Sequence, residues 1–95
     1  MKFTHEYRKL SEKVFTTIRK NTGFYKNGQA YRIDTPEQKF KAKVTGSIRI
    51  FKAEINDFLA QNDADMSAEE LIALLEKWYG KKFDDFVLLT LERVS

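Results

Sequence analysis

The pattern of hydrophobic and polar positions divides the chain into an N-terminal half of strands, a helical stretch and one closing strand. The β-branched and aromatic run Val14–Arg19 predicts a first strand, and Gln29–Asp34 predicts a second. Residues Phe40–Phe51 alternate around Gly46, which is typical of one long bent strand or of two strands joined at a bulge. The apolar run that opens Phe86–Val94 predicts a buried final strand.

Helical spacing predicts the remaining elements. Residues 3–11 start as a strand and continue into a brief helix, and a short helix follows Glu54 and breaks at residues 62–65. A longer helix begins at Ser67, because Ser67 and Glu70 have the spacing of a capping box, and ends at Gly80. Its apolar stripe consists of Leu71, Leu74, Leu75 and Trp78. We expect this stripe to pack on the sheet.

Two irregular segments separate the early strands. The stretch Lys20–Gly28 contains two glycines and two asparagines, which tolerate left-handed backbone, so it predicts a loop that carries Phe24 and Tyr25. Thr35-Pro36-Glu37 predicts a turn, since proline presets the backbone. The element order therefore predicts an α+β fold, in which many short strands favour closure into a small barrel.

The length of 95 residues allows one domain with one core, spanning 1–95. The chain has no cysteine, so a disulfide framework and thiolate metal sites are excluded, and a reducing compartment is the expectation. No apolar run has signal-peptide or membrane-spanning length. We therefore expect a soluble, cytoplasmic protein with no membrane partner, and a monomer.

Charge is distributed unevenly along the chain. Residues 1–53 contain 13 Lys and Arg against 4 Asp and Glu, whereas residues 54–95 contain 4 against 10. Clustered positive charge attracts polyanions, so the basic half indicates an anionic partner such as nucleic acid. Lysines that merely solvate strand faces would give the same count, and charge alone does not separate the two interpretations.

Several kinds of chemistry are disfavoured by the residue inventory. One histidine and no cysteine do not assemble the usual metal sites, so no metal is expected. His5 has no nucleophile elbow to serve in a catalytic triad. Gly23 and Gly28 lack the pattern of a phosphate-binding loop, so no nucleotide cofactor is expected either.

The segment Lys13–Arg19 is the strongest candidate site. Alternation along a strand places Lys13, Phe15, Thr17 and Arg19 on one face, opposite Val14, Thr16 and Ile18. An exposed face of this kind suits RNA, because arginine matches phosphate or base edges and aromatic rings stack on unpaired bases. The same residues also suit catalysis, since a threonine hydroxyl becomes a nucleophile beside a lysine base. An ordinary solvated strand face remains the alternative to both.

A resemblance to a known family joins these segments. The strand through Lys13–Arg19, the loop Gly23–Gly28, the segment Asp63–Gly80 and the ending Phe86–Glu92 together resemble an ASCH domain, over nearly the whole chain. The resemblance implies a PUA-like β-barrel of about five or six mixed strands with two or three short helices. It also implies an association with RNA and, in one bacterial branch, amide hydrolysis of N4-acetylcytidine.

The resemblance to that hydrolase branch implies a lysine base, a threonine nucleophile just before Ile-Arg, and a carboxylic acid ahead of the second helix. Lys13 and Thr17 match the first two roles, with Arg19 in place after Ile18. One extra residue separates the lysine from the Thr-Ile-Arg element, which makes Thr16 an alternative to Thr17. The acid position aligns with Ala64, and Asp63 and Asp65 flank it as candidate acids.

Two functions therefore follow as hypotheses. The first is a binding module whose basic cleft holds RNA or a modified nucleoside through six residues: Lys13, Thr16, Thr17, Arg19, Tyr25 and Lys26. The second is an amidohydrolase acting on an N4-acylated cytidine, with Lys13, Thr17 and either Asp63 or Asp65 as its catalytic residues. For Asp65 a helix-terminus role is favoured over catalysis. A protein-interaction surface on the acidic second half is a weaker third hypothesis.

Overall fold

The computed structural model describes residues 1–3 and 5–94. Within that part of the chain, the strands β1 (Val14–Lys20), β2 (Ala30–Asp34), β3 (Lys39–Ile50) and β4 (Phe86–Arg93) form one sheet in the order β1-β4-β3-β2. Every pairing in this sheet is antiparallel. The α+β class is confirmed, whereas the family resemblance implied about five or six mixed strands. The difference arises partly because residues 39–50 form a single strand.

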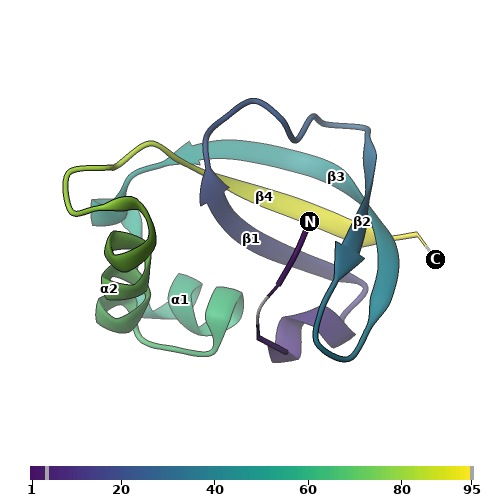
Figure 1. Ribbon diagram of the computed structural model, residues 1–95, viewed down its shortest axis with the longest axis horizontal. Helices are drawn as coiled ribbons and strands as arrows, with labels where there is room; N and C mark the ends of the chain where they lie inside the picture. Colours follow the sequence, from purple (N-terminus) through teal and green to yellow (C-terminus); the bar gives the residue numbers. More distant parts are fainter. Residues whose placement is uncertain (4, 95) are drawn as a thin grey trace.

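Gly46 is the point at which β3 bends. The register with β4 shifts between Val44 and Gly46, which is the bulge expected from the glycine in the middle of the alternating run. A Cβ at position 46 would lie 3.5 Å from the Thr90 side chain, which is an ordinary van der Waals contact. The bend contributes to a strongly twisted sheet, in which β2 is steeply inclined to β1 (Figure 1).

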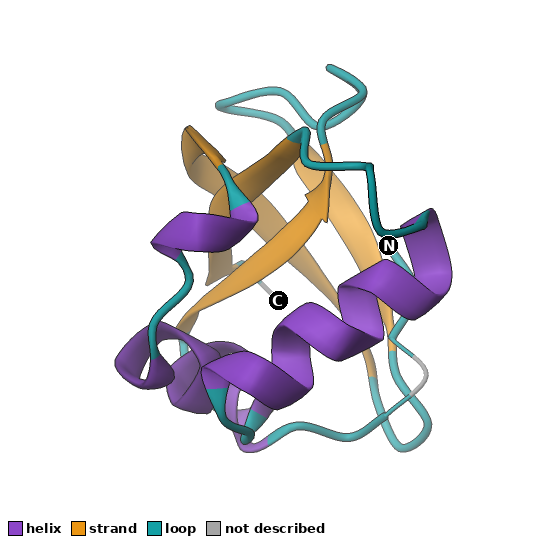
Figure 2. Cartoon of the chain, turned by 90° about the vertical axis from the view of Figure 1, so that its left-hand side faces the viewer, coloured by secondary structure: helices purple, strands orange, loops and turns teal. Residues whose placement is uncertain are grey.

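The two helices lie on the β1 side of the sheet, as Figures 1 and 2 show from two directions. Helix α1 (Asp57–Ala64) ends at Asp65, whose backbone is left-handed with φ 57°. Helix α2 (Ala68–Tyr79) begins with the predicted capping box, in which the Ser67 hydroxyl accepts from the Glu70 amide, and ends at Gly80. The short 3-10 turns η1 (Arg8–Ser11) and η2 (Lys52–Glu54) lead into β1 and α1.

Two hydrophobic clusters cover opposite faces of the sheet. Phe15, Leu89 and Leu91 share one face with residues of β2 and β3, and Phe3 and Leu10 cover them. Ile18 and Phe86 point to the other face, where α1 and α2 pack through residues such as Leu71 and Leu75. The single domain core predicted from the length is therefore divided by the sheet into two parts. β1 contributes to both.

The two-sided burial of β1 changes which of its residues face solvent. Phe15, Thr17 and Ile18 are all buried, whereas Val14 is exposed. Strand alternation leaves Thr17 on a solvent-exposed face only if Val14 and Ile18, on the opposite face, form the core. The face shared by Phe15 and Thr17 is instead an inner face, because residues 1–3 and η1 fold over it.

Candidate pocket beside β1

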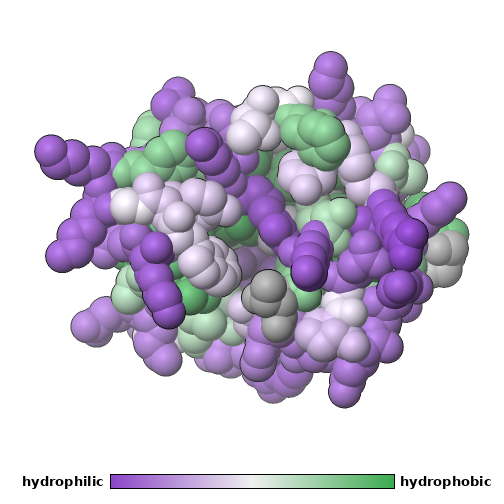
Figure 3. All heavy atoms as spheres, in the orientation of Figure 1, coloured by the Kyte–Doolittle hydropathy of each residue, from purple (hydrophilic) through white to green (hydrophobic). Residues whose placement is uncertain are grey.

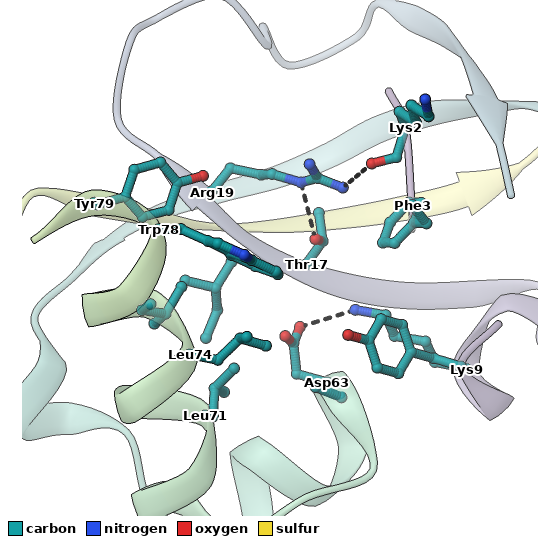
Figure 4. Close-up of a pocket in the computed structure, with 14 residues that line it drawn as sticks. Lys2, Phe3, Lys9, Thr17, Arg19, Asp63, Leu71, Leu74, Trp78 and Tyr79 are labelled. Atoms are coloured by element: carbon teal, nitrogen blue, oxygen red, sulfur yellow. Dashed lines mark hydrogen bonds and ion pairs between the residues drawn. The ribbon is translucent and has the colours of Figure 1, made fainter. Parts of the chain in front are cut away.

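A cavity of about 220 Å³ lies between β1, α2 and the N-terminal segment. Figure 4 shows its polar residues converging from three separate elements, and Figure 3 shows the hollowed face of the molecule. β1 is an edge strand, so the cavity lies where the sheet has no neighbouring strand. Its lining includes Phe3, Tyr7, Lys9, Thr17, Arg19, Asp63, Leu74, Trp78 and Tyr79.

Lys9 and Asp63 form a buried ion pair at the inner end of the cavity. The Lys9 ammonium lies 3.2 Å from Asp63 Oδ1, and both side chains are almost fully buried. The ammonium also donates to the Thr16 carbonyl over 2.6 Å. η1 supplies Lys9 and the last turn of α1 supplies Asp63, so residues 54 positions apart meet here.

Burial acts on both members of this pair. Desolvation lowers the pKa of Lys9 below its usual value of 10.5, although the charge and hydrogen bond of Asp63 partly oppose it. Desolvation likewise raises the pKa of Asp63 above 3.8, opposed by Lys9 and by a hydrogen bond from Thr16. Burial thus disfavours both charges, and transfer of the Lys9 proton to Asp63 would give a free amine and a carboxylic acid, the forms that a base and an acid require.

The two adjacent threonines lie on different sides of this pair. The Thr17 hydroxyl lies inside the cavity and accepts a hydrogen bond from Arg19 Nε at 3.2 Å. The Thr16 hydroxyl donates to Asp63 Oδ1 over 3.3 Å and lines a second, outer hollow of about 430 Å³ with Arg8 and Asp65. Thr16 therefore contacts the ion pair from the outer side, whereas Thr17, although buried from bulk solvent, lines the inner cavity.

Arg19 forms the upper wall of the cavity. Its guanidinium lies 4.7 Å from the centre of the Phe3 ring, and Nη2 donates to the Lys2 carbonyl at 3.1 Å. Burial lowers the pKa of Arg19 from 12.5, and this guanidinium still carries its charge at neutral pH. The contacts hold it beside Thr17, as Figure 4 shows, so a positive charge lies next to the buried hydroxyl.

The remaining walls are apolar and aromatic. Leu74, Trp78 and Tyr79 come from α2, and Phe3 and Tyr7 come from the N-terminal segment. Only half of the predicted α2 stripe is core, because Leu71 and Leu75 are buried while Leu74 and Trp78 are not. Flat rings around a polar inner end are the usual composition of a small-molecule site.

The structure separates the residues predicted for the site. Thr17, Arg19 and Asp63 all line the cavity. Lys13 does not, since its side chain is 75% exposed and lies 3.7 Å from Glu92. Asp65 points away from the cavity and binds Arg8 at 3.0 Å. Although partial burial acts in the opposite direction, the hydrogen bonds and charge of Arg8 hold the pKa of Asp65 below its usual value.

Lys9 is the functional candidate that the sequence pattern did not single out. It lies in the run Tyr7-Arg8-Lys9-Leu10, where two basic residues stand side by side. The 3-10 turn points Lys9 inward and leaves Arg8 exposed. Nothing in the spacing distinguishes the two, because the partner that neutralises Lys9 is far away in the chain. Tyr25 and Lys26 lie in the β1–β2 loop, where Tyr25 packs against Tyr31 and Lys26 is exposed.

Residues 1–3 and 5–94 contain neither a cluster of metal-ligating side chains nor a membrane-spanning helix. No group of three or more histidine, aspartate or glutamate side chains gathers to hold a metal ion there. No helix in the same part of the chain has the length and apolar character to cross a bilayer. Comparison with family models, curated proteins and solved structures found no significant match for this chain.

Proposed function

We propose that this chain is an ASCH-type, PUA-like domain whose inner cavity binds the base of an RNA nucleotide or modified nucleoside. The observation that carries the proposal is the composition of the cavity. Lys9 and Asp63 place a hydrogen-bond donor and an acceptor at its inner end, and Arg19 adds further donors from the wall. Its walls are aromatic or aliphatic.

A nucleobase has the complementary chemistry. Its edge presents donors and acceptors side by side, and its two faces are flat and weakly polar. Proteins that hold an unpaired base pair its edge with polar side chains and stack its faces on aromatic rings. The buried charges fix orientation here, and Trp78 and Tyr79 are positioned to contact a flat ring.

The N-terminal segment supports the barrel part of the proposal. Lys2 forms a parallel bridge with Asp34 of β2, and its carbonyl accepts from Arg19 of β1. β1 and β2 are the two outer strands of the sheet, so the segment connects its open edges. This arrangement favours a closed, PUA-like barrel over an open sheet, because closure removes unpaired strand edges.

Binding measurements on pocket variants test the proposal. We expect Arg19→Ala to weaken binding of cytidine and its N4-acylated derivatives by about 10- to 100-fold, because it removes a charged donor from a largely buried position. Isothermal titration calorimetry is the appropriate measurement. Lys13→Ala is the matched control, since Lys13 is basic and close in sequence but exposed.

Two outcomes would contradict this expectation. If Lys13→Ala weakens binding as much as Arg19→Ala, while both variants retain the wild-type melting temperature, the ligand lies on the exposed strand surface. Absence of binding to any nucleoside or RNA at low salt would overturn the proposal altogether.

A second candidate function, hydrolysis of an N4-acyl amide, is favoured by the Lys9–Asp63 pair. Neutral Lys9 would remove the Thr17 proton as the hydroxyl oxygen attacks the acyl carbon. The C–N bond would then break, with protonated Asp63 donating a proton to the departing exocyclic amine. Water would hydrolyse the resulting threonyl ester to release the carboxylic acid. The Arg19 charge beside Thr17 would stabilise the developing negative charge.

Incubation with N4-acetylcytidine tests the second candidate directly. We expect equimolar cytidine and acetate, measured by chromatography, and more slowly when Lys9 is replaced by methionine. Lys13→Met is the matched control, because it removes a lysine that lies outside the cavity. Cytidine release no faster than in buffer alone would exclude hydrolysis and leave only the binding function.

A further inference from the structure

Three aromatic side chains contact one another beside the loop between β1 and β2: Phe24 and Tyr25 lie in the loop, and Tyr31 lies on β2. Phe24 is 66% exposed, and its ring centre lies 4.9 Å from that of Tyr25 and 5.9 Å from that of Tyr31. The rings of Tyr25 and Tyr31 are 5.0 Å apart, and both residues pack against the sheet core. We call Phe24, Tyr25 and Tyr31 the loop platform.

The loop platform is fixed in position by hydrogen bonds. The Tyr31 hydroxyl donates to the Phe24 carbonyl at 3.1 Å and accepts from the Lys26 amide at 2.8 Å. At one end of the loop Asn21 bonds to Asp85, and at the other the Gly28 amide donates to the Val44 carbonyl. An exposed ring that is already ordered loses little entropy when a ligand stacks on it.

The surroundings of the loop platform are basic. From residue 13 to residue 33 the sequence contains five Lys and Arg residues and no Asp or Glu. Lys26 lies in the loop and Lys20 is the last residue of β1, and both are exposed; the Lys20 ammonium lies 5.3 Å from the centre of the Phe83 ring. Positive charge next to exposed aromatic rings is the combination by which proteins hold single-stranded nucleic acid, through phosphates and stacked bases.

The loop platform also lies close to the cavity. The loop begins directly after β1, two residues beyond Arg19, which forms the cavity wall. Tyr25 packs against the core cluster that contains Phe3, and the Arg19 guanidinium lies 4.7 Å from the centre of the Phe3 ring. Tyr25 and Arg19 therefore lie against the same core cluster.

We infer that the loop platform stacks an unpaired base adjoining the one held in the cavity, so that the ligand is single-stranded RNA rather than a free nucleoside. The inference rests on the proposed function, because the cavity supplies the first base position. Phe24 provides the stacking surface, and Lys20 and Lys26 contact the connecting phosphates. Arg19 lies between the two base positions.

Fluorescence anisotropy with a short labelled oligocytidylate, together with calorimetry on cytidine, tests the inference. We expect Phe24→Ala to weaken oligonucleotide binding roughly 5- to 150-fold, the range for one stacked base, and to leave cytidine binding unchanged. Phe24→Trp should retain binding, because it keeps a stacking ring. Phe58→Ala is the matched control, since Phe58 is 80% exposed on α1 and outside both the loop and the cavity lining.

Each outcome distinguishes the inference from the proposed function. If Arg19→Ala weakens both ligands while Phe24→Ala changes neither by more than twofold, the cavity function stands and the inference is overturned. If Phe24→Ala weakens the oligonucleotide but Arg19→Ala changes neither ligand, RNA binds at the loop platform without the cavity, which overturns both. Equal losses for Phe24→Ala and Phe58→Ala, or tighter binding of duplex than of single strands, also overturn the inference.

Discussion

Replacement of Thr17 by valine is expected to reduce cytidine release from N4-acetylcytidine by roughly 10³-fold or more, the scale of loss when a covalent nucleophile is removed. Valine has nearly the shape of threonine and lacks only the hydroxyl, which in this structure lies in the cavity beside Arg19. Substrate binding should change far less than turnover. Single-turnover kinetics and calorimetry on the same variant measure the two quantities separately.

The neighbouring threonine provides the matched control. Thr16→Val removes one hydrogen bond to Asp63 from the outer side, so we expect a loss of about tenfold or less in turnover. The reverse order, with Thr16→Val inactive and Thr17→Val active, would assign the nucleophile to Thr16. Unchanged turnover in both variants would exclude a threonyl ester intermediate.

The second large effect concerns stability. We expect Asp63→Asn to lower the free energy of unfolding near pH 6 by about 3–5 kcal/mol, because it leaves the Lys9 ammonium buried without a counter-charge. Urea titration followed by circular dichroism measures the change. Asp65→Asn is the matched control, because it breaks an ion pair with an exposed arginine and should cost about 1 kcal/mol or less.

The stability deficit of Asp63→Asn should shrink as the pH rises. Burial already lowers the pKa of Lys9 in the folded state below 10.5, and loss of the carboxylate lowers this pKa further. The folded variant therefore releases its proton at a lower pH than the unfolded chain does. Raising the pH from the folded pKa towards 10.5 consequently favours the folded state.

In the wild-type protein, Asp63 adds a pH dependence of stability that has the opposite sign to that of Lys9. The folded pKa of Asp63 lies above 3.8, so its contribution to stability declines as the pH rises from 3.8 through that folded pKa. Asp63→Asn lacks this component. A deficit that is equal at pH 6 and pH 9.5, or one that persists when Lys9 is also replaced by methionine, would contradict the assignment of the cost to an unpaired ammonium.

Local sequence patterns predicted most of the secondary structure. The run Val14–Arg19, the Ser67–Glu70 capping box and the terminating Gly80 each carry their physical cause within a few residues, and the structure confirms all three. The first helix was less well predicted. It continues through Ala64, beyond the expected break, and Phe58 is exposed, although helical spacing places it on one face with Ile55 and Leu59.

The pocket was harder to predict because its groups come from distant segments. Thr17 and Arg19 were found from the strand pattern, but the pattern assigned their face to solvent, since a two-residue period does not indicate what covers each face. Lys9 and Asp63 are functional candidates because they contact each other, and 54 positions separate them in the sequence. Periodicity carries no information about such a pair.

The place of β4 between β1 and β3 has a consequence for how the molecule folds. Until Phe86–Arg93 is available, β1 has no strand to pair with, and β3 can pair only with β2. Joining β1 to β4 requires closure of a chain segment that contains both helices, and such long-range closure slows folding. The β2–β3 hairpin can form early, whereas β1, which forms one wall of the cavity, joins the sheet only after β4 is available.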